Sequence, residues 1–219
     1  VERTAGRFIA DEQQFNVTDR IFDGQEFINF EVGYNYEHSN DNAFPTLGMA
    51  FETKFGYTSN LAENKDFGYN ISSLAITHKI IPNGKLVLAS KVKGHFNFSK
   101  DFEFYQAANI GANEGLRGFR NERFNGQNSF VHSSDLRWKL NNFKTGLIPL
   151  HIGIYTGFDY GKIWGLPNAI ATFPIENTTL HTSYGGGLFM NAAGLLGGSI
   201  GFFNSIEGPR LEVSLGFDF

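Results

Sequence analysis

Apolar and polar residues alternate along most of this chain with a period of two, which sends successive side chains to opposite faces of a β-strand. From residue 28 to 36 the even positions are apolar, and the odd positions are polar or glycine. The same alternation, in places less regular, recurs at 47–57, 69–80, 86–98, 130–140, 150–160, 181–190, 196–204 and 211–219. With a short first strand near residues 3–10, the pattern predicts about ten strands, most of them about ten residues long.

Short and long connections alternate between these strands. The short ones carry the Asn, Gly and Pro of tight turns and lie at Asn40–Pro45, Pro82–Lys85, Asn141–Pro149 and Asn191–Leu195. The longer ones lie at 11–25, 59–67, 100–129 and 162–180, with a shorter one at 204–209. Tilted strands of about ten residues cross a bilayer, and short turns opposite long surface loops are typical of outer-membrane proteins. We therefore predict an all-β fold, a transmembrane antiparallel β-barrel that occupies residues 1–219 with both termini in the periplasm.

Composition narrows the class further. The chain has 24 Phe, 8 Tyr and 26 Gly but only 18% charged residues, which suits a sheet with one apolar and one polar face. No run approaches the roughly 18 apolar residues of a membrane-spanning helix. A net charge of -4 without a basic block argues against a nucleic-acid partner. The absence of cysteine excludes disulfides and thiolate metal sites.

The sequence contains no convincing motif of a catalytic site. Ser, His and Asp occur together in the segment 132–135, but neighbouring strand residues face opposite ways and cannot form a triad. The histidines lack metal-ligand spacing, and the glycine runs at 185–187 and 194–201 lack the strand-to-helix context of a phosphate loop. We predict no catalytic residue, no metal and no cofactor within this chain, so that it is not itself an enzyme.

The loop 100–129 is the longest, and it contains the sequence NEGLRGFRNERFNG. Within it Leu116, Arg117, Gly118 and Phe119 form a hydrophobic-Arg-Gly-aromatic tetrad. This tetrad resembles that of the outer-membrane insertase and two-partner secretion superfamily of BamA, TamA and FhaC, also described as the bacterial surface antigen family. In that superfamily the loop lies in the barrel lumen, and its arginine reaches an acidic residue in each of the next two strands.

Two aspartates follow the loop at suitable places. They are Asp135 in HSSDLRWKL and Asp159 in GFDYGKIW, where Phe158, Asp159 and Gly161 resemble the Phe-Asp-x-Gly strand of the superfamily. The apolar positions of both segments are even, so both odd-numbered carboxylates point into the lumen. A guanidinium can bridge them through charge-assisted hydrogen bonds, which lysine cannot copy.

Three further features belong to the prediction. Arg123 is a supporting basic residue of the loop, and Phe119 packs the loop against the barrel wall. Glycines beside Asp159 leave room for the loop backbone. The final strand LEVSLGFDF ends on Phe217 and Phe219, which resemble the signal by which barrels are recognised for assembly. If so, missing sequence lies upstream.

The resemblance implies sixteen strands, of which this chain would supply the C-terminal part, and a periplasmic domain before them. It implies a location in the bacterial outer membrane and a role in protein assembly, insertion or translocation. The partners would be lipid and lipopolysaccharide, unfolded outer-membrane or secreted proteins, and accessory lipoproteins. Two alternatives stay open. The barrel anchors an N-terminal enzyme such as a phosphoesterase or patatin-like lipase, or it is a self-contained small structural or pore barrel.

Overall fold

The computed structural model describes residues 26–41, 44–61, 65–144, 149–165, 179–192 and 196–215. Within them, nine strands form one antiparallel sheet in which each strand pairs with its neighbours in chain order. The strands are β1 (Phe27–Ser39), β2 (Leu47–Asn60), β3 (Asp66–Lys79), β4 (Leu86–Asn97), β7 (Asn128–Lys144), β8 (Pro149–Trp164), β9 (His181–Ala192), β10 (Leu196–Ser205) and β11 (Gly208–Leu215). The predicted all-β antiparallel fold is confirmed, while the strand predicted near residues 3–10 lies outside the described residues.

The two faces of the sheet are sorted in the opposite sense to those of a soluble protein. Large apolar side chains are exposed on the outer face, as Phe30 (68%), Trp138 (53%) and Phe202 (62%) illustrate. The inner face buries polar groups, among them Asp159 at 0% and Arg137 at 2% exposure. Soluble proteins bury their apolar side chains and seldom bury a charge completely. The alternation read from the sequence therefore assigns the faces correctly.

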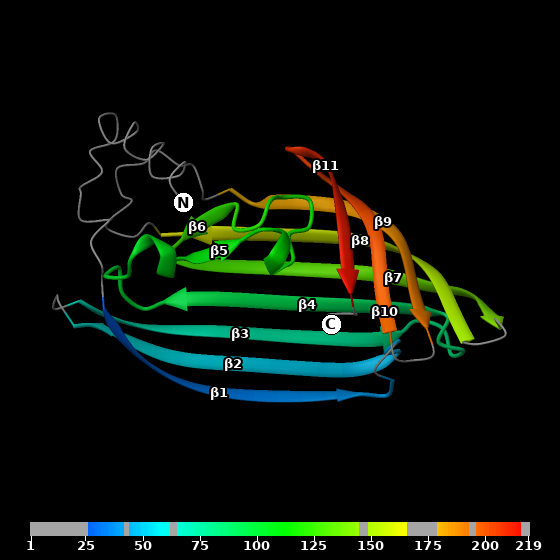
Figure 1. Ribbon diagram of the computed structural model, residues 1–219, viewed down its shortest axis with the longest axis horizontal. Coiled ribbons are helices and arrows are strands. Elements are labelled where there is room, and N and C mark those ends of the chain that lie inside the picture. Colours follow the sequence, from blue (N-terminus) through cyan, green and yellow to red (C-terminus); the bar gives the residue numbers. More distant parts are fainter. Residues whose placement is uncertain are drawn as a thin grey trace.

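The sheet is strongly curved. Strands β1 to β4, β7 and β8 lie side by side, whereas β9, β10 and β11 turn progressively away from their direction (Figure 1). In the described residues β1 and β11 pair on one side only, so both are edges of the sheet. No helix in the described part of the chain is long and apolar enough to cross a membrane.

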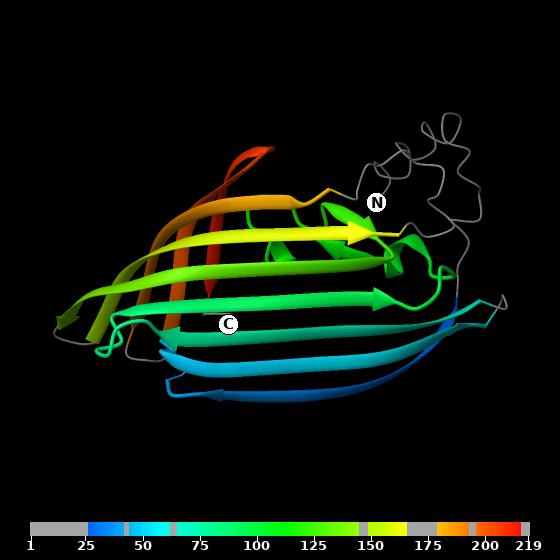
Figure 2. The same cartoon turned by 180° about the vertical axis from the view of Figure 1, so that it is seen from behind.

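The segment between β4 and β7 is more structured than the predicted loop. It contains two 3-10 turns, η2 (Phe104–Gln106) and η3 (Ala112–Glu114), and a two-stranded sheet of β5 (Ala108–Ile110) and β6 (Phe124–Gly126). This internal segment lies against the inner face, where β5 contacts β4, β7 and β8 (Figure 1). Seen from behind, the strands of the large sheet pass in front of it (Figure 2). Strands of three residues are too short to show a period of two.

Several predicted connections are shorter than expected. β2 and β3 extend to Asn60 and from Asp66, so the connection predicted at 59–67 shrinks to 61–65. The predicted turn at 141–149 is wrong at its start, because β7 continues to Lys144 after a register shift between Lys139 and Asn142. Such an irregularity interrupts the alternation that defines a strand in the sequence.

Candidate functional site: an arginine bridge inside the sheet

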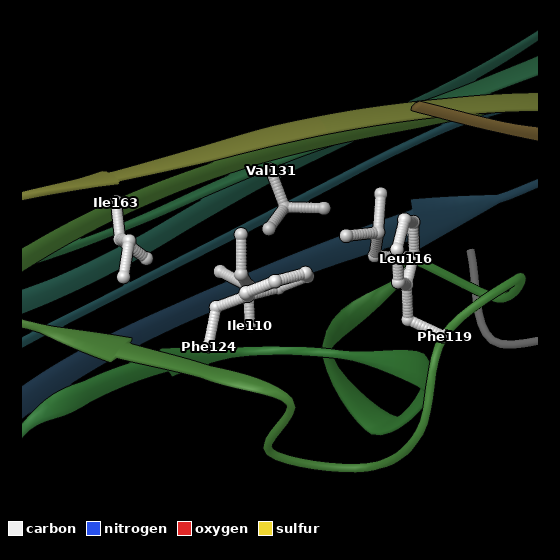
Figure 3. Packing of buried hydrophobic residues seen from close by; sticks show 6 residues of the cluster. All are labelled: Ile110, Leu116, Phe119, Phe124, Val131 and Ile163. Atoms are coloured by element: carbon white, nitrogen blue, oxygen red, sulfur yellow. The ribbon is translucent and has the colours of Figure 1, made fainter. Parts of the chain in front are cut away.

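A hydrophobic cluster fixes the internal segment to the sheet. Four of its residues come from the segment and two from β7 and β8, as Figure 3 shows: Ile110, Leu116, Phe119, Phe124, Val131 and Ile163. Phe119 is fully buried and packs edge-on against Phe124, with ring centroids 5.2 Å apart. Phe124 in turn stacks on His181 of β9 at 3.7 Å. Burying such side chains stabilises by about 1.5–3 kcal/mol each, so Leu116 and Phe119 hold the intervening Arg117 in place.

Gly115 turns the chain toward the inner face just before the tetrad. Its φ is 98°, a left-handed conformation that favours glycine. A Cβ at this position would also approach the Ser133 hydroxyl of β7 to 3.0 Å. The glycine therefore lets the chain pass close to the strand and presents the next residues to the sheet.

Arg117 makes its main contact with Asp159 on β8. Its Nη2 lies 2.6 Å from Asp159 Oδ1, and its Nε lies 3.2 and 3.1 Å from Oδ1 and Oδ2. The backbone N–H of Arg117 also donates to Asp159 Oδ2 at 3.1 Å. The Asp159 carboxylate is fully buried, and fork-like contacts of this kind are among the strongest hydrogen bonds in proteins.

The second carboxylate is Asp135 on β7. Arg117 Nη1 lies 2.8 Å from Asp135 Oδ1, and Arg137 Nη2 donates to Asp135 Oδ2 at 3.1 Å. One guanidinium therefore spans two neighbouring strands, and we call Arg117, Asp135 and Asp159 the arginine bridge. Two arginines facing two aspartates leave the cluster without net charge, which limits the cost of burying it.

The charge of Arg117 is secured by its partners. Burial by itself lowers the pKa of the guanidinium, because it removes water from the charged form. The hydrogen bonds and negative charges of Asp159 and Asp135 outweigh this effect, so that the pKa of Arg117 is raised above its ordinary value. Arg117 therefore keeps its positive charge at every physiological pH.

Gly118 continues the contact onto β9 and the end of β10. Its N–H donates to the Ser183 hydroxyl at 3.1 Å, and its carbonyl accepts from the Ser205 hydroxyl at 2.7 Å. A Cβ on Gly118 would come within 2.5 Å of the Cβ of Ser183. Ser183 itself donates to Asp159 Oδ2 at 2.9 Å. Only glycine fits between these two strands.

The glycines beside Asp159 make room for side chains rather than for the loop backbone, contrary to the sequence-based prediction. A Cβ on Gly157 would lie 2.5 Å from Arg117 Nη2 and 2.7 Å from Asp135 Oδ1. A Cβ on Gly161 would press on Ile110 at 3.2 Å. Gly157 thus opens the space that the guanidinium occupies, and Gly161 opens the space for the hydrophobic cluster.

Other predicted residues lie apart from the arginine bridge. Phe158 precedes Asp159 in β8, but its side chain is 47% exposed and lies on the outer face, opposite to Asp159. Arg123 forms an ion pair with Glu207 in the turn between β10 and β11. Phe217 and Phe219 lie outside the described residues.

Sequence reasoning missed the contributions of β9, β10 and the β4 side of the sheet. Ser183 could have been found from the sequence, because it shares the inward parity of His181. Phe203, whose ring lies 4.0 Å from the Arg117 guanidinium, gave no local signal. Neither did the ion pair between Lys93 on β4 and Glu114 on η3. These contacts join residues far apart in the chain, and only the sheet register brings them together.

The arrangement contains strong ion pairs, and a serine and a histidine also lie close together in the described residues. The Ser90 hydroxyl and His132 Nε2 lie 2.8 Å apart on the outer face, yet no group hydrogen-bonds to Nδ1 of His132 as the acid of a triad would. No group of three His, Cys, Asp or Glu residues that could hold a metal ion occurs in this part of the chain.

The described residues thus form a curved antiparallel sheet with an apolar outer face, and an arginine holds an internal segment against its inner face. The model of the haemolysin secretion/activation protein family ShlB/FhaC/HecB matches residues 13–180, and the chain belongs to this family. The predicted relationship to the BamA, TamA and FhaC superfamily is thereby confirmed.

The fold is similar to one solved structure in particular, a crystal structure of BamA from Haemophilus ducreyi lacking POTRA domains 1–3. The TM-score is 0.62 at 16% sequence identity, and the match covers 86% of this chain but 42% of that one. The chain thus spans less than half the length of that structure. No curated protein matches the chain.

Proposed function

We propose that this chain is part of an outer-membrane β-barrel that translocates polypeptides. The observation that carries the proposal is the arginine bridge, which together with the hydrophobic cluster holds the 30-residue segment 98–127 against the inner face of the sheet. A purely structural barrel has no need of a charged internal clamp, because apolar packing alone can fill a lumen. A conduit that must stay closed at rest does need one.

The faces of the sheet support the membrane location. The exposed outer side chains are large and apolar on every long strand, and such a surface is stable against lipid tails but not against water. Outer-membrane lipid and lipopolysaccharide would then be its surroundings. Unfolded secreted or outer-membrane proteins would be its clients, and accessory lipoproteins are further candidate partners.

In this proposal the internal segment is a plug, and the arginine bridge is its latch. Beside the bridge a polar cavity of about 200 Å³ remains, lined among others by Lys91, Arg137 and Glu212. A lumen with this lining solvates a polypeptide backbone, which needs hydrogen-bond partners throughout its path. We favour translocation over strand insertion because the family is one of secretion and activation proteins.

The described sheet would be the C-terminal part of a larger barrel of sixteen strands. Its two edges, β1 and β11, are each paired on one side in the described residues. The match to less than half of the BamA structure agrees with this proposal. Insertion of outer-membrane proteins, anchoring of an enzyme domain and a self-contained small pore are the competing functions.

A proteomic comparison tests these functions while the client protein is still unidentified. The gene is deleted from its bacterium and replaced by the wild type, by Arg117→Ala or by Arg117→Lys, and proteins of the medium and outer membrane are quantified. We expect one or a few secreted proteins to vanish from the medium in the deletion and in both arginine variants. Glu37→Gln, on β1 at the opposite end of the strands, is the matched control and should secrete normally.

The other outcomes are equally distinct. Loss of many outer-membrane barrels from the membrane fraction would mean insertion rather than translocation. A deletion without effect on either fraction would refute both and leave the anchor or the small pore. Full activity of both arginine variants, at normal protein levels, would remove the latch from the mechanism.

A further inference from the structure

The internal segment is attached to the last hairpin of the sheet as well as to β7 and β8. Ser205, at the end of β10, donates to the carbonyl of Gly118. In the two-residue turn that follows, Glu207 pairs with Arg123, and its N–H donates to the Ser205 hydroxyl at 3.1 Å. The β10–β11 hairpin is thus bound at two points by a segment that precedes it by about 85 residues in the chain.

Phe203 on β10 joins the hairpin directly to the arginine bridge. Its ring is fully buried and lies over the guanidinium of Arg117 at 4.0 Å. A Cβ on Gly185, its neighbour on β9, would come within 2.8 Å of Cγ of this ring, so the absence of a side chain at Gly185 leaves room for Phe203. A guanidinium on an aromatic face is attracted by the ring and shielded from water. Any displacement of β10 therefore uncovers the arginine bridge.

A tyrosine on β8 also contacts the second strand of the hairpin, β11. Tyr155 Oη donates to Glu212 Oε2 on β11 at 2.7 Å. The two residues are separated in the sheet by Gly187 on β9 and Gly201 on β10, which lie in the same row. A Cβ on Gly201 would come within 2.5 Å of the Tyr155 hydroxyl. Two glycines in one row thus let a single side chain span from β8 to β11.

We propose that the β10–β11 hairpin is the second half of the latch, so that release of the internal segment and displacement of the hairpin are one event. Phe203, Ser205 and Glu207 act as positioning residues for Arg117. This inference rests on the proposed function, because it adds that opening of the lumen also loosens the last strands. It states that the internal segment and the β10–β11 hairpin are energetically coupled.

Coupling of this kind must be reciprocal. If docking of the segment favours the docked hairpin by some factor, docking of the hairpin favours the docked segment by the same factor. Two independent attachments would instead loosen one at a time. The chain has no cysteine, which allows pairs of spin labels to be placed at chosen positions.

The experiment measures two distances in the full-length protein, purified and reconstituted into phosphatidylcholine vesicles without any client. Two doubly labelled proteins are made. In both, one label replaces Leu61 in the β2–β3 connection, which lies at the same end of the strands as the β10–β11 turn. The second label replaces Ile206 to report on the hairpin in one protein, and Arg120 to report on the internal segment in the other. All three side chains are exposed. Pulsed electron-spin resonance then gives the ratio of displaced to docked molecules for each element.

We expect Arg117→Ala to raise this ratio about 5-fold or more at Ile206 as well as at Arg120. The double variant Ser205→Ala with Glu207→Gln should do the same at Arg120, although the arginine bridge itself is untouched. Reversal of the exposed pair, Arg123→Glu with Glu207→Arg, should restore docking that either single reversal disturbs. Glu37→Gln should move neither distance.

A change confined to the element that carries the substitution would overturn the proposal. So would a failure of the reversed pair to restore the docking lost in the single variants. Because the distances are measured without a client, they are independent of secretion. Coupled distances in a protein that secretes nothing would refute the proposed function alone, and uncoupled distances in an active translocator would refute the coupling alone.

Discussion

At the scale of the residue, the two aspartates of the arginine bridge are unequal. Asp159 accepts from the side chain and the backbone of Arg117 and from Ser183, whereas Asp135 is shared with Arg137. Leaving a buried charge without its partner costs on the order of 3–5 kcal/mol. The contribution of each aspartate to the docked state should therefore follow the number of bonds that it makes to Arg117.

We predict that Asp159→Asn releases the internal segment more than Asp135→Asn does. Trypsin cleavage after the exposed Arg120 of purified protein measures the release. We expect cleavage to accelerate about 100-fold for Asp159→Asn and about 10-fold for Asp135→Asn, since each 1.4 kcal/mol corresponds to about a factor of ten. Equal rates for the two variants would show that the extra bonds of Asp159 contribute nothing.

Gly157 is a second residue whose identity the site dictates. We predict that Gly157→Ala mimics the loss of Arg117, because its methyl group would fall within 2.5 Å of the guanidinium. Overpacking of this kind costs about 1–3 kcal/mol, or roughly a 10- to 100-fold faster cleavage in the same assay. Gly33→Ala on β1 is the matched control, since its Cβ would meet its nearest atom at 3.4 Å. If both variants behave like the wild type, the space above Gly157 is not limiting.

At the scale of the element, the row Tyr155–Gly187–Gly201–Glu212 makes β11 depend on β8. We predict that Tyr155→Phe, which removes only the hydroxyl, increases hydrogen exchange of the β11 amides. A hydrogen bond to a charged group contributes about 1.5–3 kcal/mol, so exchange through local opening should rise roughly 10- to 100-fold. Tyr160→Phe alters the same strand on its opposite face and should leave β11 unchanged. Unchanged exchange in Tyr155→Phe would mean that backbone pairing alone holds β11.

The sequence could predict the strands themselves but not the contacts between side chains of different strands. A period of two specifies strands and faces from local residues alone, which is why the inward direction of Asp135 and Asp159 could be deduced. The partner of a side chain in another strand depends on register and curvature, so Phe203 and Glu212 could not be assigned. The short strands β5 and β6 were not predicted for a different reason, because a strand of three residues is too short to show a period of two.

At the scale of the whole molecule, β1 is the element that most needs a partner. Its side chains are exposed on both faces along nearly the whole strand, and in the described residues only β2 pairs with it. An unpaired edge strand with exposed apolar side chains is a site of aggregation unless another strand covers it. Edge β11 is similar, with Val213 64% and Leu215 90% exposed. The open edges therefore favour a barrel with more strands than the nine in this sheet.

We predict that the native polypeptide is well above 24.4 kDa, the mass of these 219 residues. Mass spectrometry of purified outer membranes, with the polypeptide detected through the peptide 211–219, measures it directly. A larger mass would supply the strands that pair with β1, and the domain before them would distinguish a translocase from an anchored enzyme. A mass near 24.4 kDa would mean that β1 and β11 close on each other in a small barrel, or that a second subunit covers them. A cysteine pair at His38 and Val213 would then test closure, because a crosslink within one molecule requires the two edges to meet.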